Sequence, residues 1–157
     1  MPDDAHSISS RPVIGIFDSG IGGATVLRAM LDKLPFANFV YFGDTARVPY
    51  GDKSQETIVK YALENAQFLL TKKIDLLVVA CNTASAYALD VLREHHDLPI
   101  YGVIEPGARR AIEVTRSGRI AVLGTKGTIN SGAYERAIKR LDPQMEVISI
   151  PCPLLVP

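Results

Sequence analysis

The feature that most constrains the fold of this chain is a regular alternation of short apolar runs with longer amphipathic segments. The apolar runs, typical of buried strands, lie at 13–17, 38–42, 76–80, 100–103, 120–123 and 147–150. The segments with helical periodicity lie between them, at 22–34, 54–72, 83–95, 106–115 and 131–141. This order predicts an α/β fold: a parallel sheet with helices on both faces, in the three layers of a Rossmann-like protein.

Local signals mark some of the boundaries. Asp52, followed by Gln55 three residues later, predicts the start of the second helix. Gly102 lies near the end of the fourth apolar run, and a Glu-Pro-Gly turn at 105–107 follows it. We therefore divide the chain into a flexible tail at 1–12, an α/β domain at 13–103 and the start of a second α/β domain at 104–157. Because residues 151–157 form an apolar, proline-punctuated run that needs a partner surface, we expect a truncated chain and an incomplete second domain.

The composition excludes several classes of partner. Lys plus Arg and Asp plus Glu both number 17, so the formal net charge is zero, and no basic run suggests a nucleic-acid partner. No apolar stretch approaches the roughly 18 residues that span a bilayer. The polar first ten residues do not resemble a signal peptide. We therefore expect neither a nucleic-acid partner nor a membrane, and a cytoplasmic location.

The two cysteines, Cys81 and Cys152, match neither a zinc-binding spacing nor a disulfide framework. We expect both thiols to be free in a reducing compartment, and we predict no metal site. Cys152 stands between two prolines with no His or Thr beside it, so we interpret it as a packing residue.

Cys81 directly follows a run apolar enough for a central strand and precedes a helix. In parallel sheets, ligands bind outside the carboxyl ends of the strands. A helix N-terminus favours a thiolate, so we expect a pKa for Cys81 below its ordinary value, about 8.5. Asn82 and Thr83 could hold a carboxylate beside the sulfur. The alternative is a small buried packing cysteine, but its position and its polar neighbours favour a functional thiol.

Three other strand ends carry candidate residues. Asp18-Ser19-Gly20-Ile21-Gly22-Gly23 is a glycine-rich turn before a helix, but its spacing fits neither the Rossmann fingerprint nor the P-loop. In the loop at 43–51, Asp44 and Tyr50 taken alone favour structural roles, as a turn cap and a packing residue. Thr125 and Thr128 place two hydroxyls at the mouth of a helix, which again suits a carboxylate.

Taken together, these motifs resemble bacterial glutamate racemase. The motifs are Asp-Ser-Gly-Ile-Gly-Gly at 18–23, Gly-Asp at 43–44 leading to Pro-Tyr-Gly at 49–51, Ala-Cys-Asn-Thr-Ala-Ser at 80–85, and Gly-Thr at 124–125 with Thr128. The resemblance covers the chain from about Val13 to its end. Cys-Asn-Thr alone indicates the wider group of aspartate, glutamate and hydantoin racemases, whereas the combination with Pro-Tyr-Gly points to the glutamate branch.

The resemblance implies a cofactor-independent enzyme with two similar α/β domains facing each other across glutamate, which would supply D-glutamate for peptidoglycan. It implies that Cys81 is one of two acid/base thiols and that Asp18 supports this thiol and contacts the substrate amino group, with Ser19 nearby. Asp44 would orient its loop. The substrate carboxylates would be bound by Tyr50, Gly51, Asn82, Thr83, Thr125 and Thr128.

One departure from the family pattern limits what the chain can do alone. The family's second cysteine lies in a Cys-Thr-His segment, which this sequence lacks, and Cys152 does not match it. We therefore expect a weak or inactive racemase from this chain by itself. One alternative is another racemase, or a single-cysteine isomerase or lyase, of the same superfamily. The other is a non-catalytic binding lobe. Homo-oligomerisation stays open.

Overall fold

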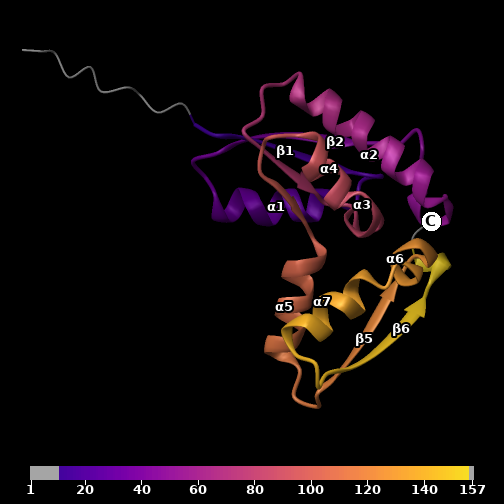
Figure 1. Cartoon of the computed structure of the whole chain (residues 1–157). Helices are drawn as coiled ribbons and strands as arrows, with labels where there is room; N and C mark the ends of the chain where they lie inside the picture. Colours follow the sequence, from indigo (N-terminus) through magenta and orange to yellow (C-terminus); the bar gives the residue numbers. More distant parts are fainter. Residues whose placement is uncertain (1–10, 156–157) are drawn as a thin grey trace, which may run out of the picture.

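The structure, a computed structural model, describes residues 11–155 (Figure 1). Residues 1–10 of the predicted tail lie outside this range. The first part of the chain forms a four-stranded sheet in the order β2-β1-β3-β4. Its strands are β1 (Val13–Asp18), β2 (Asn38–Gly43), β3 (Leu76–Val79) and β4 (Ile100–Gly102). Every pairing in this sheet is parallel, which confirms the predicted α/β class.

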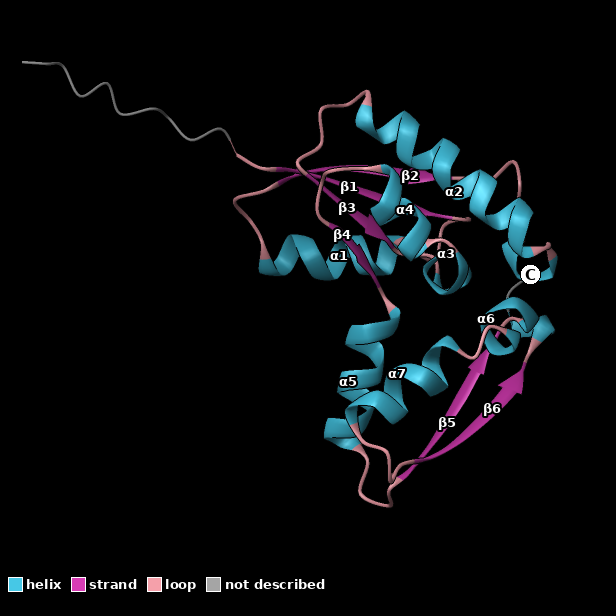
Figure 2. Ribbon diagram, viewed as in Figure 1, coloured by secondary structure: helices cyan, strands magenta, loops and turns pink. Residues whose placement is uncertain are grey.

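Helices cover both faces of this sheet (Figure 2). Successive side chains of a strand point to opposite faces, so neighbouring residues of β1 enter different cores. Ile14 and Ile16 pack with α1 (Ala24–Lys33), whereas Phe17 packs with α2 (Gln55–Leu70) and with the helices α3 (Asn82–Tyr87) and α4 (Leu89–His95). Because β1 is buried on both faces, its sequence is a continuous apolar run rather than an alternating one.

The second part of the chain forms a separate two-stranded parallel sheet, β5 (Arg119–Gly124) with β6 (Glu146–Pro151). One face packs against α5 (Ile104–Val114) and α7 (Ala133–Leu141), and Ile138 of α7 is completely buried there. The opposite face exposes Leu123, Ile148 and Ile150. The remaining elements are the short helix α6 (Lys126–Asn130) and two 3-10 turns, η1 (Tyr50–Asp52) and η2 (Pro153–Leu155). The proposed boundary at residues 103 and 104 stays a prediction.

Three helix boundaries differ from the sequence-based expectation. The single helix expected at 83–95 is divided at Ala88 into α3 and α4. The expected Glu-Pro-Gly turn lies inside α5, where Pro106 is tolerated because first-turn N–H groups have no intrahelical partner. Ser54, not Asp52, caps α2, because its Oγ accepts the N–H of Thr57.

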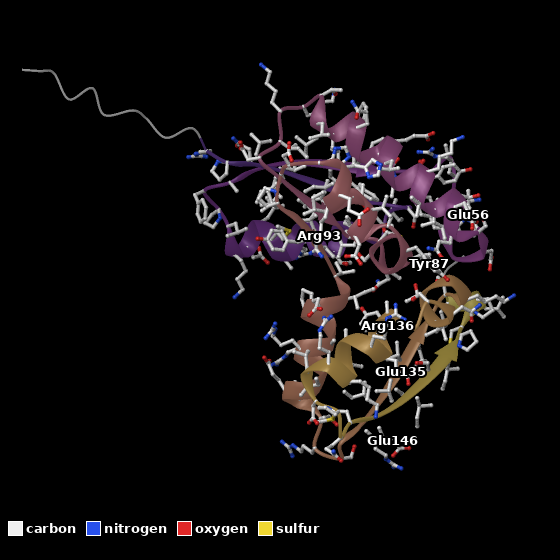
Figure 3. The ribbon with its side chains drawn as sticks, in the orientation of Figure 1. Glu56, Tyr87, Arg93, Glu135, Arg136 and Glu146 are labelled. Carbon is white, nitrogen blue, oxygen red and sulfur yellow. The ribbon has the colours of Figure 1, made fainter. Side chains whose placement is uncertain are left out.

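Acidic side chains occupy the first turns of several helices. Glu56 in α2 and Glu135 in α7 are examples, and both are labelled in Figure 3. Such charges favour the helix, because its N-terminus carries a partial positive charge. Within residues 11–155, no helix is both long enough and apolar enough to cross a membrane.

Candidate active site

A cleft of about 680 Å³ lies between the carboxyl ends of the strands of the first sheet and the second part of the chain. Its walls come from the loops after β1, β2, β3 and β5, together with α5 and α7. All the residues predicted to act in catalysis or substrate binding line this cleft, namely Asp18, Ser19, Tyr50, Gly51, Cys81, Asn82, Thr83, Thr125 and Thr128. The fold thus brings together segments more than 100 residues apart in sequence.

Cys81 lies at the end of β3 and caps α3. Its sulfur accepts the N–H of Ala84 at 3.4 Å, and its thiol donates to Ser19 Oγ at 3.4 Å. The residue is only 5% exposed. The thiol therefore has a fixed direction at the wall of the cleft, with little access to bulk water.

The pKa expected for Cys81 from its position before a helix is wrong in direction. Burial raises the pKa of this thiol, and its hydrogen bonds with Ser19 and with the N–H of Ala84 lower it by less. The nearby carboxylate of Asp18 raises the pKa further. From α3, the N–H of Ala84 hydrogen-bonds the sulfur, and this single donor does not offset the loss of hydration.

We expect the alkylation of Cys81 by iodoacetamide to increase with pH through a midpoint above that of a free cysteine, about 8.5. The thiolate is the reacting species, and burial keeps the thiol protonated. The measurement uses a Cys152→Ser variant, so that one thiol remains, and compares the folded chain with the same chain in urea. A folded-state midpoint below that of the urea-unfolded chain would show that the local donors outweigh burial.

The Asp18 carboxylate is held by the glycine-rich turn. Its Oδ2 accepts the N–H of Gly20 at 3.1 Å and that of Gly23 at 3.0 Å. A Cβ at Gly23 would lie 2.6 Å from Asp18 Cβ and 2.9 Å from Ala80 Cβ, so only glycine fits there. This glycine thus allows the chain to pass close enough to hold Asp18 at the cleft.

Three threonine hydroxyls meet at one end of the cleft. Thr83 Oγ1 lies 2.9 Å from Thr125 Oγ1 and 3.1 Å from Thr128 Oγ1, and the last two are 3.0 Å apart. Thr125 also caps α6 by accepting the N–H of Thr128 at 3.1 Å. Because Thr83 belongs to the first part of the chain, this cluster joins the two parts with rotatable hydroxyl donors.

A closed ring of hydrogen bonds holds the loop after β2. Arg47 donates from Nε to Asp44 Oδ2 at 2.7 Å and from Nη2 to Asn65 Oδ1 at 2.8 Å. Asn65 Nδ2 donates to the Tyr50 hydroxyl at 3.0 Å, and that hydroxyl donates to Asp44. Because arginine can only donate, the direction of every bond is determined.

Tyr50 thus turns its hydroxyl into the protein, and burial together with the bond to Asp44 raises its pKa. A contribution of Tyr50 to ligand binding must therefore come from its backbone. The next residue, Gly51, touches the second part of the chain, because a Cβ there would lie 2.4 Å from Thr125 Cβ. The structural roles favoured for Asp44 and Tyr50 on sequence alone agree with this geometry.

Sequence reasoning did not identify Arg47, Asn65 or Tyr134 as part of this region. Asn65 is 1% exposed and is a polar residue on the buried face of α2, a signal that the sequence could have given. Tyr134 lines the cleft from α7, and its hydroxyl donates to Asn82 Oδ1 at 2.8 Å. Cys152 does not line the cleft, and its thiol lies 3.6 Å from the carbonyl of Ile150.

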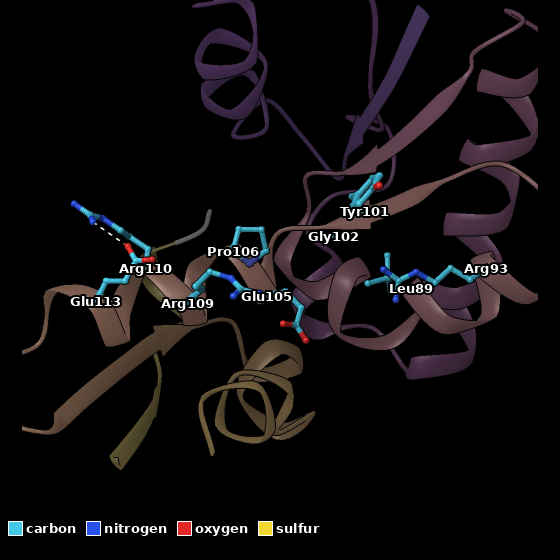
Figure 4. A pocket seen from close by; sticks show the side chains of 9 residues that line it. All are labelled: Leu89, Arg93, Tyr101, Gly102, Glu105, Pro106, Arg109, Arg110 and Glu113. Carbon is cyan, nitrogen blue, oxygen red and sulfur yellow. Dashed lines mark hydrogen bonds and ion pairs between the residues drawn. The ribbon is translucent and has the colours of Figure 1, made fainter. Parts of the chain in front are cut away.

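A second cavity of about 510 Å³ lies near the junction of β4 and α5, and Figure 4 shows its side chains. Its charged groups are largely paired: Arg110 with Glu113 at 3.1 Å, and Glu105 with Arg140. None of the predicted site residues lines it. Within residues 11–155, no group of three His, Cys, Asp or Glu side chains is placed to hold a metal ion. The larger cleft therefore carries the candidate active site.

The family model for Asp/Glu/hydantoin racemases matches residues 14–149, and the chain belongs to that family. The chain is 61% identical to the glutamate racemase of Geobacter metallireducens over 144 residues, which are 92% of this chain and 53% of that protein. It thus spans about half the length of the curated relatives it matches.

Solved structures of glutamate racemases share the fold. The Bacillus anthracis enzyme is 46% identical with a TM-score of 0.90, over 93% of this chain and 55% of that one. The Francisella tularensis enzyme, solved in complex with D-glutamate, is 42% identical with a TM-score of 0.83, over 92% of this chain and 54% of that one.

Proposed function

We propose that this chain carries one of the two acid/base thiols of a cofactor-independent glutamate racemase, with Cys81 as that thiol. The observation that supports this most is the position of Cys81 in a cleft that also gathers Asp18, the threonine cluster and the backbone of Tyr50 and Gly51. The relatives' names support glutamate as the substrate. In a cell the product would be D-glutamate for peptidoglycan, made in the cytoplasm.

The chemistry follows from the requirements of inversion at a carbon centre. The Cys81 thiolate would take the α-proton of glutamate and become a thiol, leaving a carbanion that a second thiol protonates on the opposite face. The α-proton is a very weak acid, so the site must stabilise negative charge on the α-carboxylate with fixed donors. The hydroxyls of Thr83, Thr125 and Thr128 would serve as such donors. The carboxylate of Asp18 would accept a hydrogen bond from the substrate ammonium group.

A single thiol can remove a proton and return one to the same face, but it cannot invert the centre. Cys152 does not line the cleft, so among residues 11–155 only Cys81 offers a thiol there. We therefore propose that the chain by itself exchanges the α-proton of one enantiomer with solvent, with little or no racemisation. In a protein of the relatives' full length, the opposite thiol would come from the half that this chain does not span.

The test is to incubate the purified chain separately with L- and D-glutamate in deuterated water. Proton NMR follows loss of the α-proton signal, and optical rotation follows inversion. Exchange of one enantiomer with retained rotation supports the proposal. Rapid loss of rotation would contradict the one-thiol assignment, and absence of exchange with either enantiomer would contradict Cys81 as a competent base in this chain.

The same assay separates the two alternative functions. A related isomerase or lyase would exchange or convert aspartate or a malonate in preference to glutamate. A non-catalytic binding lobe would bind an amino acid without exchanging its α-proton. Size-exclusion chromatography coupled to light scattering would show whether the chain forms a homo-oligomer.

A further inference from the structure

Tyr134 links the second part of the chain to the residue beside the candidate catalytic thiol. It lies in the first turn of α7, and its hydroxyl donates to Asn82 Oδ1 at 2.8 Å. Asn82 directly follows Cys81 and is the first residue of α3. Both Tyr134 and Asn82 line the cleft. The bond therefore acts on a side chain that lines the candidate active site.

The direction of this bond determines which end of the Asn82 carboxamide remains available. A carboxamide has an acceptor oxygen and a donor nitrogen on opposite sides. With its oxygen occupied by the phenol, Asn82 keeps its two N–H groups, and Nδ2 makes no hydrogen bond to another residue within the described part of the chain. A carboxylate can only accept hydrogen bonds, so the orientation seen in the structure, with Oδ1 on the Tyr134 hydroxyl, suits a carboxylate, whereas a flipped carboxamide would present its oxygen to it.

The ring of Tyr134 packs directly against Gly107 of α5. Gly107 lies in the interior of α5, where glycine costs about 0.8–1 kcal/mol relative to alanine. A Cβ at this position would lie 3.1 Å from the Tyr134 hydroxyl oxygen and 3.2 Å from its Cε1. Gly107 therefore leaves the space in which the ring lies. Burial also raises the pKa of Tyr134, so its hydroxyl stays protonated and able to donate.

We propose that Tyr134 is a positioning residue, which holds the Asn82 carboxamide with its N–H groups toward the cleft so that they bind a carboxylate of the amino-acid substrate. This assignment rests on the proposed function. A positioning role differs from a purely structural contact between the two parts of the chain. If Tyr134 positions Asn82, removal of its hydroxyl must change both the environment of the Asn82 carboxamide and the affinity for the substrate.

The first test needs no ligand. In a ¹⁵N-labelled chain, the side-chain amide signals of Asn82 are identified as the pair lost in Asn82→Ala. Tyr134→Phe keeps the ring and removes the hydroxyl, and it should shift that pair. Tyr101→Phe is the matched control, because Tyr101 is 54% exposed and does not line this cleft. An unshifted Asn82 pair in a folded Tyr134→Phe chain would overturn the proposal.

The second test measures affinity through protection of Cys81. Alkylation of Cys81 is followed against glutamate concentration in a Cys152→Ser background, and each variant is normalised to its own rate without glutamate. Tyr134→Phe should raise the half-protecting concentration about five- to tenfold, the effect of one lost hydrogen bond, and Tyr101→Phe should leave it unchanged. Equal protection in both variants would overturn the proposal. If glutamate does not protect the unmodified chain, the proposed function fails, and the amide signals alone decide the role of Tyr134.

Discussion

Replacing Cys81 by serine is expected to reduce exchange of the glutamate α-proton with solvent by a factor of about 10²–10⁴, the usual contribution of a positioned general base. A serine hydroxyl has nearly the same size, and it can still accept the N–H of Ala84 that the sulfur accepts now. It is, however, far too weak an acid to supply an anion at neutral pH. The measurement is the rate at which the α-proton signal disappears in deuterated water.

The matched control for this substitution is Cys152→Ser, because it makes the same chemical change outside the cleft. It should leave the exchange rate within about twofold, as expected for a residue without contact to substrate. Equal loss of exchange in the two variants would contradict the assignment of Cys81. Unchanged exchange in Cys81→Ser would show that another group removes the proton.

Replacing Asp44 by alanine should lower the free energy of unfolding by about 3 kcal/mol, a large loss for a single substitution. Asp44 is 4% exposed and accepts hydrogen bonds from both Arg47 and Tyr50. Its removal leaves the Tyr50 hydroxyl and a partly buried guanidinium without their acceptor. Urea denaturation followed by circular dichroism measures the change. The slope of the unfolding free energy against urea concentration should be the same in both proteins, as evidence of the same unfolding transition.

An exposed aspartate provides the control for this prediction. Asp90 lies 3.6 Å from Arg93, and its side chain is 91% exposed. Asp90→Ala should lower the free energy of unfolding by about 1 kcal/mol or less, because water already solvates its pair with Arg93 and its charge in the first turn of α4 adds only a small stabilisation. Similar losses for the two variants would show that the buried hydrogen bonds of Asp44 contribute little to the stability of the protein.

The order of the strands and helices was predictable because the apolar runs are short and amphipathic segments separate them. β1 and β3 are buried on both faces, so their residues form continuous apolar runs that cannot be confused with amphipathic helices. The division of one expected helix at Ala88 was not predictable, because no glycine or proline marks it. The true cap of α2 was missed because Asp52 and Ser54 are both good capping residues, and only the backbone conformation distinguishes them.

The residues that line the cleft were predictable as a list, but their electrostatic environment was not. Each motif follows a strand, and the carboxyl ends of parallel strands meet at one edge of the sheet. The direction of the Cys81 pKa shift was wrong because desolvation depends on everything packed around the sulfur, which a local motif does not reveal. Tyr134 was missed for a similar reason: its partner, Asn82, lies 52 residues away in sequence.

The sequence by itself determined the α/β class, the thiol at the end of a central strand and the residues that gather around it, because strand patterns and turn motifs are local properties of the chain. Only the tertiary structure decided the state of those groups. Burial raised the pKa of Cys81, the ring through Asn65 turned the Tyr50 hydroxyl away from the cleft, and Tyr134 of α7 donates a hydrogen bond to Asn82 beside the thiol. Hydration and hydrogen-bond direction depend on neighbours from distant segments, and those neighbours are brought together only by folding.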